Sequence, residues 1–97
     1  MADADLYDIG DVIRLTGTFS VDGVDTDPTT ITLKVKDPSK NVATYTYALA
    51  ELTKSDTGIY YRDISIDEGG IWWYRWEGTG TVESAEEGKF SVRMSEF

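Results

Sequence analysis

The sequence predicts an all-β protein, an antiparallel β-sandwich of about seven short strands that contains no disulfide. Short segments in which apolar and polar residues alternate are separated by turn residues roughly every 8–12 positions. No segment repeats its apolar residues with the period of an amphipathic helix. Cysteine is absent from the 97 residues, so packing alone must stabilise the fold.

Seven segments are predicted to be strands or short edge segments: turn residues flank them, and apolar residues recur at every second position in all but the first. These segments are 6–11, 12–19, 29–37, 42–48, 59–66, 70–78 and 89–94. The first is expected to be a short edge segment that follows a frayed lead-in over residues 1–5. The side chains expected to face the core from five of them are Ile13, Leu15, Gly17, Phe19, Ile31, Leu33, Val35, Ala43, Tyr45, Tyr47, Tyr60, Ile64, Ile66, Phe90, Val92 and Met94.

Polar and small residues predict the connections. The segment 20–28 contains Asp-Gly and Asp-Pro pairs and is expected to be a polar loop. The chain around Leu52 is too short for an independent helix and is expected to form a loop and a short strand, with a turn at 54–58. The acidic stretch 78–88 is expected to be a hairpin loop. Arg62 falls on an inward position and requires a bulge or a side chain that extends toward solvent.

The segment 70–78 holds all three tryptophans and is expected to organise the core. In an extended strand one face carries Trp72, Tyr74 and Trp76. The opposite face carries Ile71, Trp73, Arg75 and Glu77. The aromatic face is expected to be buried, because the opposite face contains two charged groups that are costly to bury without partners.

Composition excludes several classes of function. The formal net charge is −9, which opposes binding to a phosphate backbone or to anionic lipid, so neither nucleic acid nor membrane is an expected partner. No apolar run follows Met1, so no signal peptide or transmembrane segment is expected. Histidine and cysteine are absent, which removes the commonest general base and the thiolate nucleophile. The chain is expected to be one domain over 1–97, without enzymatic activity or a cofactor.

The candidate interaction residues are Trp73, Tyr61 and Arg75. Two outward aromatic rings on one sheet face are able to stack on a sugar or to anchor a protein partner, and exposed aromatic residues often mark interfaces. No metal site is expected. The weak candidates are the three carboxylates of Asp22, Asp25 and Asp27, whose oxygens suit calcium but whose spacing does not match an EF-hand loop.

Five short motifs occur in a characteristic order along almost the whole chain. They are YDIGDV at 7–12, VKDPS at 35–39, TGIY at 57–60, GIWWY at 70–74 and KFSV at 89–92. This order resembles the immunoglobulin-like domains of prokaryotes and their viruses and, more distantly, macroglobulin-type sandwiches. The run at 56–60 resembles a tyrosine-corner motif, which implies a hydroxyl that ties a turn to the strand after it. The cysteine pair of antibody domains is missing.

The run YRWEG at 74–78 and the ending FSVR at 90–93 resemble small proteins encoded among the head and neck structural genes of tailed bacteriophages. The resemblance implies a virion structural or accessory protein, such as a head-decorating or head–tail-associated subunit. It implies a phage capsid or neck protein as partner, a homo-oligomer as one possible state, and a location in the virion after assembly in the host cytoplasm. Two alternatives stay open: a carbohydrate- or cell-surface-binding module, and an engineered or excised domain of a larger surface protein.

Overall fold

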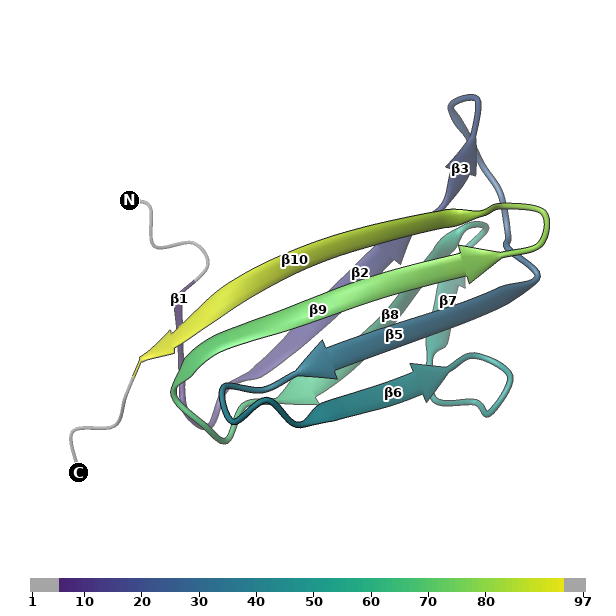
Figure 1. The fold of residues 1–97 in the computed structure, drawn as a ribbon. Helices are drawn as coiled ribbons and strands as arrows, with labels where there is room; N and C mark the ends of the chain where they lie inside the picture. Colours follow the sequence, from purple (N-terminus) through teal and green to yellow (C-terminus); the bar gives the residue numbers. More distant parts are fainter. Residues whose placement is uncertain (1–5, 94–97) are drawn as a thin grey trace.

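The computed structural model describes residues 6–93, and these residues contain strands, turns and loops but no helix. The strands are β1 (Leu6–Asp8), β2 (Val12–Thr18), β3 (Ser20–Val21), β4 (Val24–Asp25), β5 (Thr30–Lys36), β6 (Val42–Thr46), β7 (Thr53–Asp56), β8 (Ile59–Ser65), β9 (Gly70–Thr79) and β10 (Ser84–Arg93). A larger sheet has the order β1-β10-β9-β5-β6, and a smaller sheet has the order β2-β8-β7 (Figure 1). The predicted all-β class is confirmed.

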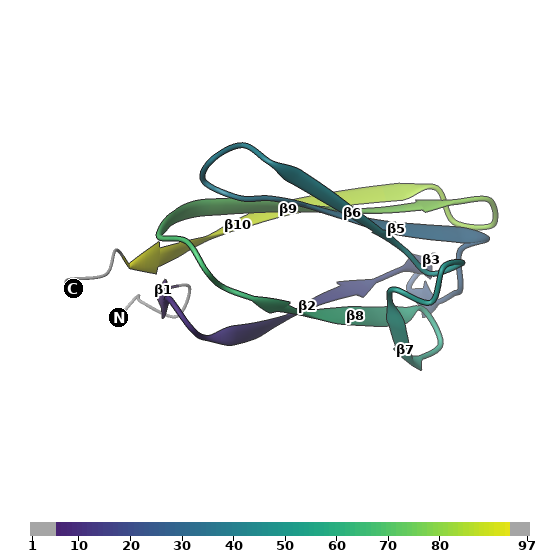
Figure 2. The ribbon, with the colours of Figure 1, turned by 90° about the horizontal axis from the view of Figure 1, so that it is seen from below.

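The two sheets form two layers that face each other across the apolar core, which is consistent with a β-sandwich (Figure 2). All neighbouring strands pair antiparallel except β1 and β10, which are parallel. The seven predicted segments all contain a strand, and the short strand expected around Leu52 is β7, which begins one residue later. Alternation located the strands that have one buried face, whereas none of the residues of the edge strand β6 is fully buried.

Most of the predicted inward side chains are buried between the layers. The fully buried large side chains are those of Trp76, Tyr60 and Leu33. Trp76 packs against the backbone of β2 at Gly17, where an added Cβ would lie only 2.5–2.9 Å from atoms of the indole ring. A glycine at this point therefore allows the two sheets to approach each other closely.

Four expectations about inward residues are wrong or only partly right, and all concern the larger sheet. Tyr74 and Tyr45 pack against the core but are only half-buried, and the ring of Tyr74 lies 6.5 Å from that of Phe90. Tyr47 is 41% exposed and lies beyond the end of β6, and Ala43 is exposed on β6. The smaller sheet has fewer strands than the larger one, so the edge strand β6 is covered incompletely. Met94 and residues 1–5 lie outside the described residues.

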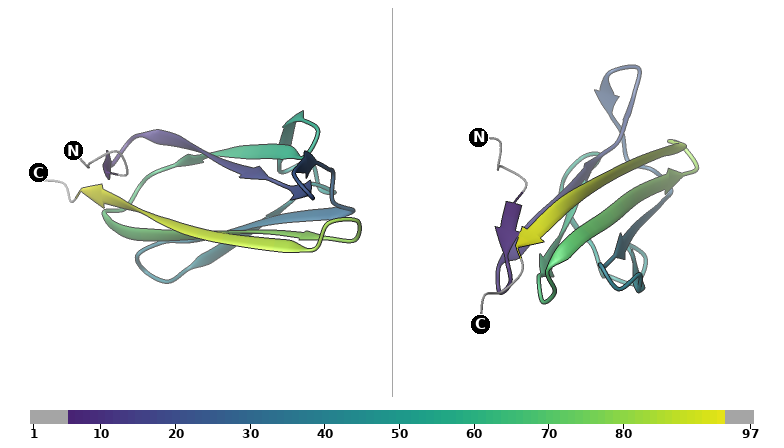
Figure 3. Two further views of the ribbon diagram at one scale, coloured as in Figure 1. Left: turned by 90° about the horizontal axis from the view of Figure 1, so that it is seen from above. Right: turned by 60° about the vertical axis from the view of Figure 1, so that its left-hand side comes forward.

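The expected loop at 20–28 contains a short hairpin made of β3 and β4. Its two-residue turn has positive φ at both Asp22 (52°) and Gly23 (83°), which is the backbone of a type I′ turn. This hairpin, residues 20–25, pairs with neither sheet and projects from the end of the molecule (Figure 3). The Asp-Gly pair was the signal for it, although two-residue strands are too short to show alternation.

Two other connections are shorter than expected. Residues 53–56 belong to β7, so the predicted turn at 54–58 is limited to Thr57 and Gly58. The predicted loop at 78–88 is also wrong, because β9 continues to Thr79 and β10 begins at Ser84. Backbone pairing such as that between Ser84 and Gly78 extends this hairpin where exposed acidic side chains give no apolar pattern.

Arg62 reaches its inward position through an extended side chain and not through a bulge. Its Nη1 donates to the carbonyl oxygen of Glu51 at 2.7 Å, and its guanidinium lies 4.0 Å from the ring centroid of Tyr45. The charge is thus held between a carbonyl and an aromatic ring at the half-covered edge of the core, as expected for a snorkelling side chain.

Asp27, just before β5, joins several segments at one end of the fold. Its Oδ1 accepts hydrogen bonds from the backbone N–H of Gly58 (2.7 Å) and the hydroxyl of Tyr60 (2.8 Å), and its Oδ2 accepts one from Lys54 Nζ (2.7 Å). The Thr81 hydroxyl donates to the Asp27 carbonyl oxygen. The Lys54 hydrogen bond, followed by those from Gly58 and Tyr60, lowers the pKa of Asp27 to about 2.

The role of Tyr60 differs from the tyrosine corner that the resemblance implies. Its hydroxyl donates to a side chain 33 positions earlier in the chain, and not to the turn beside it. Burial, together with the neighbouring Asp27 carboxylate, raises the pKa of Tyr60. The hydroxyl therefore stays protonated and donates to the carboxylate.

The contact between Gly17 and Trp76 gives a first testable prediction. Gly17→Ala is expected to destabilise the protein by about 1–3 kcal/mol, because a methyl group would overlap the indole ring. Thr16→Ala is a matched control, since Thr16 is exposed on the same strand and the substitution adds no atom to the core. Urea unfolding of both variants provides the measurement. Equal losses of stability would contradict a special role for the Gly17 contact.

Asp27 gives a second prediction, on pH dependence. Its pKa is lowered from 3.8 to about 2 in the folded state, so its stabilising effect is present above the ordinary pKa and is lost as pH falls through about 2. The difference in unfolding free energy between wild type and Asp27→Asn should be constant above about pH 5 and shrink between about pH 4 and about pH 2. Urea unfolding across this range measures it. A difference that does not change with pH would refute this account of Asp27.

Candidate functional site

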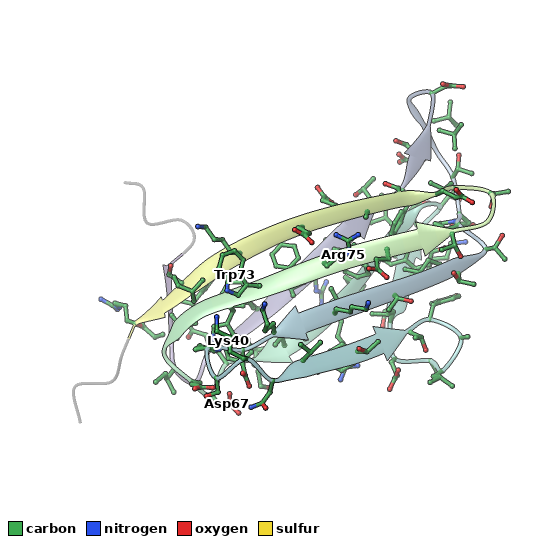
Figure 4. All side chains as sticks on the ribbon, in the orientation of Figure 1. Lys40, Asp67, Trp73 and Arg75 are labelled. Carbon is green, nitrogen blue, oxygen red and sulfur yellow. The ribbon has the colours of Figure 1, made fainter. Side chains whose placement is uncertain are left out.

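The outer face of the larger sheet carries the predicted interaction residues Trp73 and Arg75. Both lie on β9, the central strand of this sheet, on the side opposite the buried Trp72 and Trp76. Trp73 is 41% exposed. Figure 4 shows Trp73 near the beginning of β9 and Arg75 farther along the strand. A large aromatic ring is therefore presented on a face formed by regular strands, which hold its position.

Strand register places Trp73 in a row of side chains that crosses four strands. Its direct partners are Lys89 on β10 and Lys36 on β5, and Lys36 is paired in turn with Val42 on the edge strand β6. Directly paired residues share a face of the sheet. The ammonium group of Lys89 lies 5.2 Å from the Trp73 ring centroid. We call Lys89, Trp73, Lys36 and Val42 the tryptophan row.

The next row along the sheet is an ion-pair network. Arg75 contacts Glu77 through Nε and Glu87 through Nη1, each at 2.6 Å, and Lys34 Nζ lies 3.6 Å from Glu77. The hydrogen bonds to Glu77 and then Glu87 raise the pKa of Arg75, and the hydrogen bond from Arg75 is the main cause that lowers the pKa of Glu77. The cations of this row are thus matched by carboxylates.

The tryptophan row differs from this network because its cations lack acidic partners. Among residues 6–93, Lys36, Lys40 and Lys89 form no ion pair with a carboxylate. Lys40 lies on the turn between β5 and β6, at the same end of the sheet as Trp73 (Figure 4). That turn contacts the start of β9, where Pro38 lies beside Gly70. Three lysines without acidic partners therefore occupy the end of the sheet that carries one exposed tryptophan.

Apolar groups extend this surface. Val42 is 58% exposed and Ile71 is as exposed as Trp73. An open hollow of about 230 Å³ lies between the tryptophan row and the ion-pair network, lined among others by Lys36, Val42, Trp73 and Arg75. The surface offers a ring for stacking, apolar contact and free ammonium groups for anions. Protein interfaces commonly combine such groups.

Tyr61 is not part of this surface. It lies on β8 in the smaller sheet, and its outward ring is covered by the guanidinium of Arg14, 3.9 Å from the ring centroid. Arg14 in turn pairs with Asp63 at 2.9 Å. Trp73 and Tyr61 therefore lie on opposite outer faces, and the expected platform of two rings on one face is wrong. Alternation predicts which residues point outward but does not say which sheet they belong to.

The three aspartates named as weak metal candidates lie in different surroundings. Asp27 uses both carboxylate oxygens for the hydrogen bonds described above, whereas Asp22 and Asp25 lie on the exposed β3–β4 hairpin. Within residues 6–93 no group of three or more acidic, histidine or cysteine side chains is placed to hold a metal ion. The structure thus assigns Asp27 a role in joining segments.

The sequence did not identify Lys36, Lys40, Lys89 and Val42 as members of the candidate surface. Lys36 and Lys89 directly follow or precede the predicted inward residues Val35 and Phe90 and so fall on the outward face, but their proximity to Trp73 depends on the strand order, which brings β10, β9, β5 and β6 side by side. Alternation shows which residues of each strand face outward. Which of these residues lie next to Trp73 follows only from the register of each strand pair.

In the part of the chain that the structure describes, no helix has the length and apolar character needed to cross a bilayer. Comparison with protein-family models, curated proteins and solved structures found no match for this chain.

Proposed function

We propose that this chain is a non-enzymatic structural or accessory protein of a tailed-phage particle, and that it binds other proteins of the particle through the surface around Trp73. The observation that carries the proposal is the exposed tryptophan, surrounded by lysines that lack acidic partners, on the outer face of the larger sheet. Tryptophan is among the residues that most often dominate binding energy at protein interfaces. Membership of a virion rests on the motif resemblance.

The proposal includes an immunoglobulin-like topology, which the strand order supports. If the eight strands of the two sheets are lettered in chain order as A′, B, C, C′, D, E, F and G, the larger sheet has the order A′-G-F-C-C′ and the smaller sheet has the order B-E-D. Immunoglobulin-type sandwiches likewise separate strands G, F and C from strands B, E and D. The parallel pairing of β1 with β10 places the first strand against the last.

The composition of the surface favours a protein partner. Aromatic and aliphatic side chains at the centre of a patch, with charges around them, are the usual arrangement of a protein interface. The acidic chain as a whole, with a net charge of −9, favours solubility of many copies before assembly. A proton-transfer or nucleophilic role has no support, since the sequence contains neither histidine nor cysteine.

The second candidate is a module that binds carbohydrate on a cell surface. The exposed Trp73 ring beside a hollow of about 230 Å³ supports it, because sugar rings stack on aromatic faces. The position of Tyr61 on the opposite sheet removes the second ring that such a platform would use. A glycan array probed with wild type and Trp73→Ala tests this candidate, and binding that depends on Trp73 would favour it.

The proposed function predicts that the chain cosediments with purified particles that were produced without its gene. Trp73→Ala should weaken this binding by about 30-fold or more, because a central tryptophan is commonly a hot spot. Tyr61→Ala is the matched control: it removes an aromatic ring from the opposite outer face and should leave binding unchanged. Circular dichroism shows whether each variant is folded.

Two results would count against this proposal. Wild type that fails to bind particles would remove the virion role. Loss of binding in Tyr61→Ala, with binding retained in Trp73→Ala, would place the interface on the smaller sheet.

A further inference from the structure

The β3–β4 hairpin is a second exposed feature, and its chemistry complements the tryptophan row. Val21 and Val24 are 41% and 65% exposed. Asp22 and Asp25 on the same hairpin make no ion pair with any described residue. The hairpin thus combines two apolar side chains with two free carboxylates, whereas the surface around Trp73 combines apolar groups with free ammonium groups.

The two features lie at opposite ends of the same molecule. Phe19, which immediately precedes the hairpin, contacts Gly78 near the end of β9. Trp73 lies five positions earlier on the same strand, about 17 Å away, and the hairpin projects farther from the sheets (Figures 1 and 3). The hairpin of one chain therefore does not reach the Trp73 surface of that chain, and any contact between them joins two molecules.

We propose that the β3–β4 hairpin of one copy docks on the tryptophan row of a second copy, so that copies associate head to tail. Val21 and Val24 pack on Trp73 and Val42, while Asp22 and Asp25 pair with lysines of the surface. The inference rests on the proposed function in one respect, because it takes the Trp73 surface to be a protein interface. The partner that it assigns to this surface is a neighbouring copy of the chain.

The opposite charges of the hairpin and the tryptophan row explain why the hairpin of one copy meets the tryptophan row of another. Two copies with a net charge of −9 each repel one another, so association requires the most positive part of one surface to meet an acidic part of the other. The tryptophan row contains two lysines and no carboxylate, and the hairpin contains two aspartates and no cation. Such an interface is heterologous, and repetition of it generates a ring or a linear array.

The contact area of one hairpin is small, so association of free chains is expected to be weak. On a particle, where copies are tethered close together, the same contact gains from high effective concentration. Screening by salt should weaken it further, because its charged groups are exposed.

The test uses two variants of the full chain. The surface variant is Lys36→Glu/Lys89→Glu. The hairpin variant is Asp22→Asn/Asp25→Asn, in which asparagine tolerates the positive φ of position 22 and neither residue attracts the carboxylates of the surface variant. Analytical ultracentrifugation at up to about 1 mM chain should show that wild type associates at about 0.05 M salt and dissociates at about 0.5 M. Each variant alone should be monomeric.

The decisive sample is an equimolar mixture of the two variants. One partner keeps an intact hairpin and the other keeps an intact Trp73 surface, so the mixture should form a 1:1 dimer that does not grow. Monomeric wild type over the whole concentration range, association that survives in both single variants, or a mixture that stays monomeric would each overturn the inference.

A measurement on wild type alone tests the inference even if a variant misfolds. In ¹⁵N NMR spectra of wild type, dilution should shift amides of residues 20–25 together with those around Trp73, and shifts confined to other residues would overturn the inference. Particle cosedimentation distinguishes the two proposals. Wild type that binds particles through Trp73 but never self-associates leaves the proposed function standing, whereas a mixed dimer without particle binding leaves only the head-to-tail contact.

Discussion

The close approach of Trp76 to Gly17 is the constraint on which the rest of the structure depends. The indole ring fills the space directly against the backbone of β2, where any side chain would collide with it. This contact fixes both the separation of the sheets and the face that β9 turns inward. Since successive residues of a strand point to opposite sides, burying Trp76 also buries Trp72 and exposes Trp73. The candidate binding surface is therefore a geometric consequence of the core.

Strand register then determines the chemistry of that surface. The same pairing that aligns Leu33 with Trp76 inside the fold aligns Lys36 with Trp73 outside it. Two residues farther along, Arg75 meets Glu87 and Lys34, and charges cancel. Adjacent rows on one sheet thus have different character, because β10 contributes Glu87 to the ion-pair network and Lys89 to the tryptophan row. The strand order brings each of these residues beside β9, and the residue at each register position then sets the charge of the row.

Alternation in the sequence predicted the fold class and most of the main strands, because most of them have one buried face. It failed where burial does not decide the structure. The β3–β4 hairpin and the first half of β10 are exposed on both faces, so backbone pairing forms them without an apolar pattern. Trp73 and Arg75 were identified as outward residues, but Tyr61 was grouped with them wrongly. Assigning a residue to one of two sheets requires long-range pairing, which periodicity does not contain.

The distribution of charge shows why the three unpaired lysines are informative. The chain has 18 acidic and 9 basic residues, so carboxylates are available in excess. Lys34 and Lys54 both have acidic partners, and Arg62 is held by a carbonyl oxygen and an aromatic ring. Random placement of so many acids would leave few cations without a neighbouring carboxylate. Within residues 6–93 the remaining lysines lie at the Trp73 end of one sheet, and the exposed hairpin at the other end holds two aspartates that form no ion pair, so the proposed head-to-tail contact would bring these opposite charges together.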